Sequence, residues 1–396
     1  MLRHGICVGR TSSRNCLKST NIMNDTDYHL HVIAFDVPYP ANYGGVIDVF
    51  YRVKALSEAG VKVHLHCFEY GRGEQEILKR YHEVKYYKRD TSFAKQLSLT
   101  PFIVTSRRSE ALVQDLLKDD YPILCEGLHT TAILSDKRLK NRKIYVRAHN
   151  VEHDYYNGLG DTEKCGWKRF FYYAEAWKLR RYEPVLKNAS GIFAISQQDA
   201  DYFRERYNNV IFVPGFNSAD SVCSETGRGD FVLYHGNLSV KENETAAKWL
   251  IENVFSELRT HCVIAGLNPS DKLKKTVEKH LNVTLVANPD DAEMIDLLRQ
   301  AQVNVLVTNQ PTGLKLKLLN ALYNGRFCLV NEEMVKGTSL ESLCVVANEP
   351  EQMIAEIKRL MKEDFTEDDI EERDAQMRQL YDNEANARKI IETIFR

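Results

Sequence analysis

The amino-acid sequence predicts an α/β protein of two tandem domains, each a parallel sheet wound with helices. Short β-rich runs alternate with helical patterns in the first half of the chain, and the same alternation restarts in the second half. Between them, residues 213–230 hold seven Ser, Thr or Gly residues after a Val-Pro pair, which is typical of a linker. Strands that alternate with helices need crossover connections and therefore run parallel. We expect two Rossmann-like domains that face a cleft.

Strand candidates occupy both halves of the chain. The runs of the first half with the length and composition of strands are 29–36, 61–68, 84–87, 121–126, 143–149 and 191–196. Those of the second half are 231–236, 261–266, 282–287, 303–308, 326–330 and 343–347. Helical patterns lie between most of these runs; the pattern at 46–60 ends at a glycine, and a polar helical tail begins at about residue 350.

The expected domain boundaries follow from these patterns. Residues 1–26 form a leader or a disordered tail: the first 22 residues carry four basic and no acidic side chains, which suits either a transit segment or a stretch ahead of a true start at Met23. We expect an N-terminal domain at 27–212, a linker and C-terminal domain at 213–380, and a last helix at 381–396 that can pack back on the N-terminal domain.

Charge and cysteine content exclude several classes of function. Lys plus Arg number 53 and Asp plus Glu number 55, so the net charge of −2 gives no overall signal for nucleic acid or another polyanion. The nine cysteines show no C-x-x-C or metal spacing, as expected of reduced thiols in a cytoplasmic protein. No apolar run approaches the roughly 18–20 residues of a membrane span.

Two glycine-containing loops follow predicted strands. Gly44 and Gly45 stand between a strand and a helix, and so does Gly236, with Asn237 and Lys241 close behind. Ligands of open α/β sheets bind at the carboxyl ends of strands, where helix N-termini favour anions. Each loop alone is a weak signal, because a simple turn also uses glycine and the spacing is not G-x-G-x-x-G.

Polar side chains also crowd the exit of the strand at 143–149. They are Arg147, His149, Asn150 and Glu152. His149 and His153 lie four residues apart and would suit zinc if the segment were helical, but no third ligand follows at a recognisable spacing. The other interpretations are a set of hydrogen-bonding groups that face a cleft and a solvated polar loop.

Two lysines interrupt the leucine-rich stretch "PTGLKLKLLNALYNGRFCLVN" at 311–331. A helix over 313–324, ended by the glycine after it, would place Lys317 and Asn320 on one polar face near its positive N-terminus. There a lysine suits a diphosphate and an asparagine suits a hydroxyl-bearing group. The alternative is that the lysine stems lie along apolar surface with their charges in water, which suffices for Lys315.

The motifs together resemble a known family. From about residue 28 the chain is similar to family 4-type glycosyltransferases of the GT-B fold, above all bacterial sugar transferases that carry "RAHNVEHDYY" and "TGLKLKLLNAL". The P-Y-P…G-G segment, "ISQQD", "HGNLS" and "IAGLNP" add to the match. The resemblance implies an acceptor in the N-terminal domain, a nucleotide-sugar donor in the C-terminal domain, and transfer in the cleft between them.

The resemblance also implies roles for individual residues. Lys317 matches the basic residue on the donor diphosphate, and His149 matches the histidine that lines the sugar site; these two are the expected catalytic residues. The set implied for the diphosphate and nucleotide is Gly44, Gly45, Gly236, Asn237, Lys241, Thr312, Gly313, Leu314 and Asn320. The set implied for the sugar and acceptor is Arg147, Asn150, Glu152 and Ser196.

One feature departs from the family pattern. Two glutamates eight residues apart are usual there, and they would fall at Thr312 and Asn320. An amide can hold a ribose diol, but it lacks the charge-assisted strength of a carboxylate. The departure keeps open a catalytically inactive protein that binds a sugar nucleotide, and the double-Rossmann pattern also suits a nucleotide-sugar epimerase.

The expected reaction is hexosyl transfer, with mannose and glucose as candidate sugars, to a glycan or lipid-linked acceptor in surface polysaccharide assembly. We expect retention of configuration and neither a metal nor another cofactor, since no D-x-D pair follows a strand. An inverting enzyme would instead need a carboxylate base, for which Asp36 and Glu152 are candidates.

A basic and aromatic segment at 164–189 combines seven Lys or Arg with seven Trp, Phe or Tyr residues, and residues 98–108 add an apolar and basic stretch. The simpler interpretation packs the aromatics on the sheet and leaves the charges solvated. The functional one is peripheral contact with anionic lipid at the inner face of the cell membrane.

Overall fold

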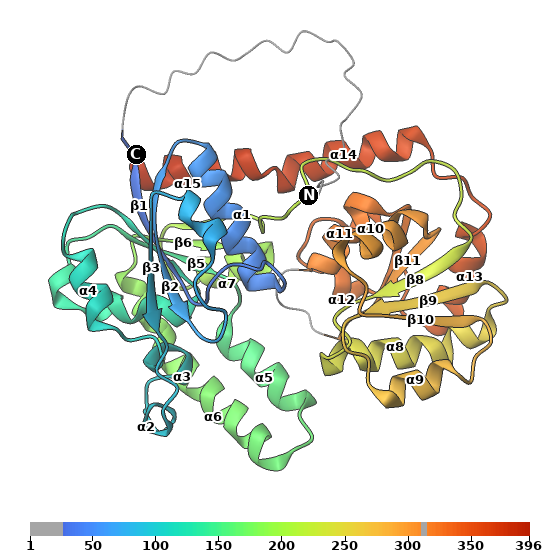
Figure 1. Ribbon diagram of the computed structural model, residues 1–396, viewed down its shortest axis with the longest axis horizontal. Coiled ribbons are helices and arrows are strands. Elements are labelled where there is room, and N and C mark those ends of the chain that lie inside the picture. Colours follow the sequence, from blue (N-terminus) through green and yellow to red (C-terminus); the bar gives the residue numbers. More distant parts are fainter. Residues whose placement is uncertain (1–26, 310–314) are drawn as a thin grey trace, which may run out of the picture.

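The computed structural model describes residues 27–309 and 315–396, and these form two parallel sheets with helices around them (Figure 1). The N-terminal sheet has the strand order β3-β2-β1-β4-β5-β6-β7, and the C-terminal sheet has the order β10-β9-β8-β11-β12-β13. The neighbouring strands of both sheets pair in parallel. The chain therefore has the α/β fold of two Rossmann-like domains that its sequence predicts.

The elements of the N-terminal half alternate along the chain. The strands are β1 (His29–Ala34), β2 (Lys62–Glu69), β3 (Glu83–Lys88), β4 (Ile123–Glu126), β5 (Ile144–Ala148), β6 (Gly191–Ala194) and β7 (Val210–Phe212). The helices are α1 (Gly44–Glu58), α2 (Phe93–Gln96), α3 (Phe102–Thr105), α4 (Glu110–Leu116), α5 (Glu152–Thr162), α6 (Gly166–Tyr182) and α7 (Gln197–Arg204). The 3-10 helices are η1 (Glu76–Arg80), η2 (Leu128–Ser135), η3 (Lys137–Leu139) and η4 (Glu183–Asn188).

The C-terminal half repeats the alternation. Its strands are β8 (Phe231–His235), β9 (His261–Gly266), β10 (Val283–Ala287), β11 (Val303–Leu306), β12 (Phe327–Val330) and β13 (Val345–Val346). The helices are α8 (Lys241–Asn253), α9 (Asp271–Val277), α10 (Asp291–Gln300), α11 (Leu316–Asn324), α12 (Glu332–Val335), α13 (Pro350–Leu360), α14 (Glu367–Tyr381) and α15 (Asn383–Phe395). Two 3-10 helices, η5 (Phe255–Glu257) and η6 (Glu341–Leu343), complete it.

Every expected strand is present, with ends that differ from the expected ones by two residues or fewer. The sequence interpretation missed β7, a three-residue edge strand that directly precedes the expected linker. The polar tail is three helices, α13 to α15. None of the described helices has the length and apolar character that crossing a bilayer requires.

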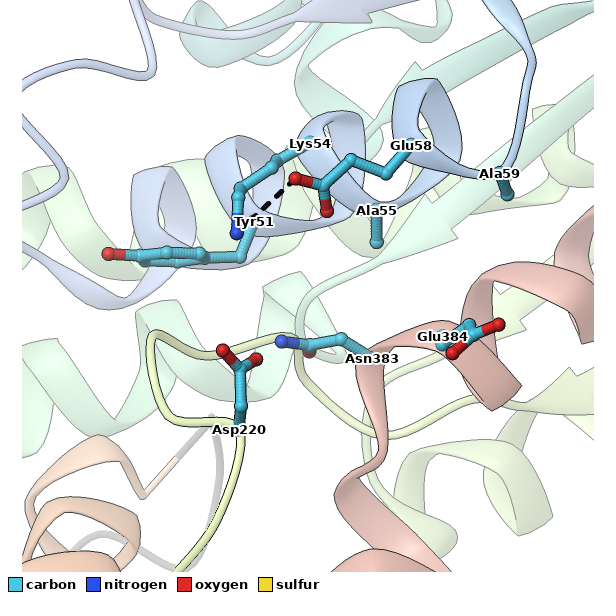
Figure 2. A pocket seen from close by; sticks show the side chains of 8 residues that line it. All are labelled: Tyr51, Lys54, Ala55, Glu58, Ala59, Asp220, Asn383 and Glu384. Carbon is cyan, nitrogen blue, oxygen red and sulfur yellow. Dashed lines mark ion pairs between the residues drawn. The ribbon is translucent and has the colours of Figure 1, made fainter. Parts of the chain in front are cut away.

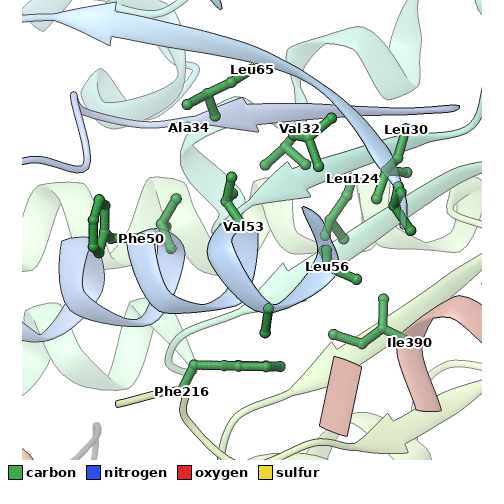
Figure 3. Close-up of a cluster of buried hydrophobic side chains, with 14 of the residues drawn as sticks. Leu30, Val32, Ala34, Phe50, Val53, Leu56, Leu65, Leu124, Phe216 and Ile390 are labelled. Atoms are coloured by element: carbon green, nitrogen blue, oxygen red, sulfur yellow. The ribbon is translucent and has the colours of Figure 1, made fainter. Parts of the chain in front are cut away.

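The core of the N-terminal half lies between its sheet and two helices that are far apart in the sequence. Leu30 and Val32 of β1 belong to one buried cluster with Val53 of α1 and with Ile390 and Ile394 of α15 (Figure 3). The buried residues of α15 recur at helical spacing, so one face of this helix is apolar. The last helix thus leaves the C-terminal half and packs beside α1, as Figure 1 shows.

The chain crosses between the halves twice, once in the linker and once just before α15. The two crossings are joined side by side: Asn383 Nδ2 donates to the carbonyl of Asn217 at 2.9 Å, and the Asn217 amide donates to Asn383 Oδ1 at 3.3 Å. A cavity of about 350 Å³ opens between this junction and α1, with Tyr51 and Lys54 on one side and Asp220 on the other (Figure 2).

In each sheet the strand order reverses once, between β1 and β4 and between β8 and β11. Open α/β sheets form their ligand crevices at such points, outside the carboxyl ends of the strands. Gly44 and Gly45 follow β1, and Gly236 follows β8. The two glycine loops therefore lie at the two switch points.

Candidate functional site

A cavity of about 620 Å³ lies between the two halves. Tyr155 and Asp161 of α5 and Gln198 of α7 line it from the N-terminal half, and Lys241 and Thr245 of α8 line it from the C-terminal half. Lys241 is exposed and is the first residue of α8, whose first-turn N–H groups have no side-chain cap. The cleft that the sequence predicts is therefore present and contains one of the expected donor residues.

The N-termini of α1 and α11 lie next to each other. A β-carbon added to Gly44 would lie 3.7 Å from Leu316 Cδ1, in ordinary contact. A β-carbon on Gly45 would lie 2.6 Å from Phe35 Cζ, so any larger residue there would force the Phe35 ring at the end of β1 to move. Two helix N-termini that converge in this way favour an anion between them.

Lys317 reaches the switch point of the C-terminal sheet. Its Nζ donates to Asn243 Oδ1 and to the carbonyl of Val307, both at 3.2 Å, and lies 5.8 Å from the ring centroid of Tyr234. Burial lowers the pKa of Lys317 to about 8, and the charge of Glu242 only partly opposes this. Among the described residues, its hydrogen-bond partners are both neutral oxygens, so the ammonium is desolvated without a paired anion.

Lys315 does not lie with its charge in water. The side chain is only 8% exposed, and burial lowers its pKa to about 8. Three acids favour its charged form: Glu242, Glu333 and Asp199, the last of which belongs to the N-terminal half. The sequence expectation of a snorkelling lysine is wrong, because these acids come from distant segments that only the fold brings together.

Three other expected residues of this stretch, Thr312, Gly313 and Leu314, lie outside the described residues. Asn320 is exposed one turn after Lys317. Gly325 ends α11 as expected, but its φ of −95° is not left-handed. Its glycine has a spatial cause instead: a β-carbon there would lie 2.2 Å from Asn304 Nδ2.

The other donor residues surround Lys317. Asn243 Nδ2 donates to the carbonyl of Asn237 at 3.0 Å, and a β-carbon on Gly236 would lie 3.3 Å from Asn243 Cγ. Thr308 donates to Glu242 through its hydroxyl. Beside Thr308 is a further cavity of about 190 Å³, whose walls include Trp249, Asn309, Asn331, Asn348 and Met353.

A buried ionic network underlies the N-terminal side of the cleft. Its members are Asp48, Arg52, Glu126, Arg147 and His149, of which the first four are fully buried. Arg147 donates to both oxygens of Asp48, at 3.1 and 2.9 Å, and Arg52 donates to Asp48 and Glu126. Burial alone would raise the pKa of Asp48, but Arg147 and Arg52 hold it below its usual range.

This network changes the interpretation of Arg147. Its guanidinium also donates to the carbonyls of Val213 and Pro214, which fastens the start of the linker. With no exposed surface, Arg147 lies beneath the site rather than in it. The sequence analysis missed Asp48 and Arg52, although a charged pair four residues apart on the apolar face of a predicted helix was a usable signal.

His149 sits at the upper edge of the network. Its Nε2 is 3.0 Å from Glu126 Oε2, and its ring stands perpendicular to Phe35 with 5.4 Å between the centroids. The oxygens and nitrogens of Asp48, Glu126 and His149 are close enough to share a metal ion. Arg52 already provides the positive charge between the two carboxylates. His153 contacts Glu183 instead, so the two histidines have different partners.

Above the network, Glu152 has an unusual environment. Its Oε1 is buried without a hydrogen-bond partner, 3.8 Å from His129 Nδ1, which also lacks one. Burial and the charge of Asp199 raise the pKa of Glu152 to about 8, although Arg107 and a hydrogen bond with Asn150 oppose the shift. A neutral carboxylic acid at pH 7 can donate a hydrogen bond to a bound hydroxyl.

Ser196 caps the N-terminus of α7 next to this acid. It accepts from the Asp199 amide at 3.0 Å and donates to Asp199 Oδ2 at 2.7 Å. Burial raises the pKa of Asp199 to about 6. The structure thus brings Asn150, Glu152 and Ser196 together at the carboxyl ends of β5 and β6. His129, which follows β4, is an addition that sequence reasoning did not find.

Comparisons with known proteins place the fold. No family model matches the sequence. A relative with 26% identity over 355 residues is an uncharacterized 44.6 kDa protein in the cps region of Klebsiella pneumoniae; the match covers 82% of this chain and 86% of the relative.

Solved structures match nearly the whole chain. Sucrose-phosphate synthase from Thermosynechococcus elongatus has a TM-score of 0.67 at 14% identity, covering 92% of this chain and 98% of the other. TarM has a TM-score of 0.66 at 12% identity, covering 94% and 99%. HepE from Anabaena in complex with UDP has a TM-score of 0.62 at 12% identity, covering 92% and 99%. Sucrose-phosphate synthase and TarM are GT-B glycosyltransferases, and this chain has the same two-domain fold.

Proposed function

We propose that the protein is a glycosyltransferase that moves a hexose from a nucleotide-sugar donor to a glycan or lipid-linked acceptor. The observation that carries the proposal is the desolvated ammonium of Lys317 at the switch point of the C-terminal sheet, on the helix whose N-terminus adjoins that of α1. A diphosphate is the anion that this arrangement suits, because it is large enough to meet both the lysine and the helix N-termini. The solved structures with UDP bound support a nucleotide donor.

In the proposed reaction, the bond between the sugar's anomeric carbon and the diphosphate oxygen breaks, a bond to the oxygen of an acceptor hydroxyl forms, and the hydroxyl proton passes to the departing diphosphate. Lys317 and the N–H groups of α1 and α11 stabilise the negative charge that develops on the leaving diphosphate. We propose that the configuration is retained, and that no divalent metal is needed because these groups supply the positive charge from the protein itself. Lys241 adds a second ammonium at the edge of the cleft.

On the acceptor side, the neutral acid of Glu152 and the ring of His129 offer hydrogen bonds to hydroxyl groups. His149 lies beside them and lines the sugar position. We expect His149→Ala to lower transfer strongly while nucleotide affinity stays near that of the wild type, since the imidazole is on the sugar side of the cleft. Addition of Mg²⁺ or Mn²⁺ is expected to leave the transfer rate unchanged.

The first experiment titrates the purified protein with UDP, GDP, ADP and CMP and records the thermal unfolding midpoint. A nucleotide present at 100 times its dissociation constant adds roughly 2.7 kcal/mol to the free energy of unfolding. The sugar nucleotides of the base that binds, with glucose and mannose first, are then assayed for transfer. If none of the four nucleotides shifts the midpoint, the donor site proposed here is wrong.

A second candidate function is that of an inactive partner that binds the sugar nucleotide without turning it over. Asn320 favours it, because it stands exposed where a ribose-binding glutamate is usual in the family that the sequence resembles. Asn320→Glu separates the two: in an active enzyme it changes the Michaelis constant of the donor. An inactive partner shows tighter nucleotide binding and still no transfer or donor hydrolysis.

We further propose that the enzyme works at the inner face of the cell membrane, in surface polysaccharide assembly. The relative in a cps region supports this pathway. Six large apolar side chains on α2, on the residues just after it and on α6 are 53–83% exposed: Phe93, Leu97, Leu99, Trp167, Phe170 and Trp177. On α6 the last three fall on one face of the helix, so they can enter a lipid interface together.

The segment that follows α2 is fixed to α6 through two buried side chains of that helix. Glu175 accepts from the Phe102 amide at 2.7 Å, and Lys178 donates to the carbonyls of Gln96 and Ser98 at 3.3 and 3.1 Å. Lys178 is therefore buried and cannot meet lipid, although its place in the sequence suggests that it acts together with Arg180 and Arg181. The exposed basic residues of α6 are Lys168, Arg169, Arg180 and Arg181.

Sedimentation with vesicles that contain anionic lipid tests this surface. We expect salt-sensitive binding that falls about 100-fold when Lys168, Arg180 and Arg181 become Glu, at about 1 kcal/mol for each charge. The matched control reverses three exposed lysines of α9 on the other half: Lys272, Lys274 and Lys275. Equal losses in the two triple variants, or no binding by the wild type at low salt, would favour a soluble acceptor.

A further inference from the structure

Histidines form two rows across the N-terminal sheet, near the amino ends of its strands and therefore opposite the cleft. The sequence His-Leu-His occurs on both β1 and β2, so the four imidazoles project from one face of the sheet. In the outer row, His29 Nδ1 is 2.8 Å from His64 Nε2. In the inner row, His31 Nδ1 is 2.8 Å from His66 Nε2. His82, which precedes β3, joins the outer row alone, with its ring centroid 5.3 Å from that of His29 and 4.9 Å from that of His64.

The hydrogen bonds of the outer row leave two nitrogens facing each other. His64 Nδ1 is 2.9 Å from Glu83 Oε2, and His29 Nε2 is 3.4 Å from Asp27 Oδ2. A carboxylate only accepts hydrogen bonds, so a ring proton on each of these two outer nitrogens satisfies both contacts. The two inner nitrogens, His29 Nδ1 and His64 Nε2, then present lone pairs to each other at 2.8 Å. A cation between the rings, whether a proton or a metal ion, removes the repulsion between these two lone pairs.

We propose that this outer row is a zinc site, in which His29 Nδ1, His64 Nε2 and one ring nitrogen of His82 bind Zn²⁺ and water completes a tetrahedron. The candidate ligand atoms of the three residues already lie within 4.8 Å of one another. Zinc binds imidazole nitrogen at about 2.0–2.1 Å and accepts three histidines with one open position. Ligand nitrogens on a tetrahedral zinc are about 3.4 Å apart, so the pair need separate by only about half an ångström.

The residues around the three histidines are of the kind that support a zinc site. Glu83 and Asp27 hold the outer nitrogens as carboxylates do behind zinc-bound histidines, which fixes the tautomer and strengthens the ligand. Tyr121 stacks on His29 at 4.3 Å between centroids and orients its ring. His82 is exposed, so the ion can enter from solvent. Among the described residues, the inner row has no comparable third ligand.

The zinc site would fasten the amino ends of three strands. His29 begins β1, His64 lies near the start of β2, and His82 directly precedes β3. Binding to the folded chain adds to its stability by mass action. The site lies at the sheet edge away from the cleft, so its occupancy does not depend on the reaction proposed above.

The test uses the full chain, purified without a histidine tag, and zinc sulfate alone as the probe. Competition with a chromophoric chelator should give one zinc per chain with micromolar or tighter affinity. His82→Ala should weaken binding at least tenfold, and Glu83→Gln should weaken it by about tenfold. The matched control is His261→Ala, an exposed histidine of the C-terminal sheet, which should bind zinc as the wild type does.

Cobalt provides a second readout. Co²⁺ in the wild type should show the intense visible absorption of a four-coordinate site, and the His82→Ala protein should not. Because His82 is exposed, the variant should unfold at the wild-type temperature when no metal is present, and only the wild type should gain stability with zinc. Identical zinc affinities for His82→Ala and the wild type, or less than one zinc per wild-type chain, would overturn the proposal.

Discussion

The two sides of the cleft hold their charges in opposite ways. On the N-terminal side, two buried carboxylates are matched by two buried guanidiniums: Asp48, Glu126, Arg52 and Arg147. On the C-terminal side, burial lowers the pKa of Lys317 to about 8, and its hydrogen-bond partners within the described chain are neutral. A paired network gains nothing from another ion, whereas a desolvated ammonium gains most when an anion arrives. We propose that the first arrangement supports the site and that the second binds the anionic part of the donor.

The largest expected effect comes from breaking the paired network. Asp48→Asn leaves Arg52 and Arg147 with one carboxylate between them, in a place without solvent. Loss of one partner from a buried ion pair typically lowers the free energy of unfolding by about 3–5 kcal/mol. Urea unfolding measures this. The control, Asp271→Asn in an exposed pair with Lys274, should change stability by less than about 1 kcal/mol.

The next effect separates binding from support. Lys317→Ala should lower turnover by about 100-fold or more, since it removes a charge that stabilises the leaving diphosphate. The fold should not suffer: because burial disfavours this ammonium, Lys317→Met should raise the free energy of unfolding at pH 7 by about 1–2 kcal/mol. Transfer assays and thermal melts of the same preparations test both statements. If Lys317→Met is less stable than the wild type and has normal turnover, Lys317 has a structural role and does not bind the diphosphate.

The pH dependence of nucleotide affinity sharpens the same distinction. Lys317 has a pKa of about 8 in the free protein, below its ordinary value, and a bound diphosphate favours its charged form. Affinity for the nucleoside diphosphate should therefore be highest below pH 8 and fall by up to about tenfold per pH unit above it. Calorimetric titrations between pH 7 and pH 9.5 measure this. In Lys317→Met the fall above pH 8 should be reduced.

Stability should follow pH in the opposite direction. The folded-state pKa values of Lys315 and Lys317, about 8, lie below the unfolded value, so the unfolded chain binds more protons between about pH 8 and pH 10.5. These two lysines therefore make the free energy of unfolding rise with pH across that window. The contribution should be smaller in the Lys317→Met protein, which retains only Lys315.

The smallest expected effect concerns Glu152. Its pKa of about 8 keeps the carboxyl neutral at pH 7, where Gln is its closest substitute. Glu152→Gln should keep transfer at pH 7 within a few-fold of the wild type and extend activity to higher pH. Glu152→Ala, which cannot donate a hydrogen bond, should lose more. If Glu152→Gln abolishes transfer, the carboxylate acts as a base and the reaction inverts configuration.

The fold was predictable because its signal is local. Each strand and helix carries its own hydrophobic period, and their alternation leaves parallel sheets as the solution. The polar face of α11 was predictable in the same way, since Lys317 and Asn320 lie three residues apart on one helix. The glycine loops were placed correctly at the strand exits, because the switch points follow from the order of the strands.

The environment of individual charges was not predictable. Lys315 and Lys317 lie two positions apart in one stretch, and of the acids near Lys315 one, Asp199, is more than a hundred residues away in the sequence. The position of Arg147 at the end of a strand predicts a site residue, yet its partners are Asp48 and the carbonyls of the linker. How deeply a charged side chain is buried, and which groups it contacts, depend on the assembled fold. Local patterns in a single sequence do not predict them.

The double crossing between the halves has a mechanical consequence. Asn217 and Asn383 are hydrogen-bonded to each other where the chain passes between the domains. Any closure of the cleft would therefore use this point as its hinge. The unit that can be exchanged between related proteins is then not a simple N-terminal fragment. A functional chimera must carry α15 together with β1 and α1. Without α15, the apolar surface of β1 and α1 that Ile390 covers would be exposed to solvent.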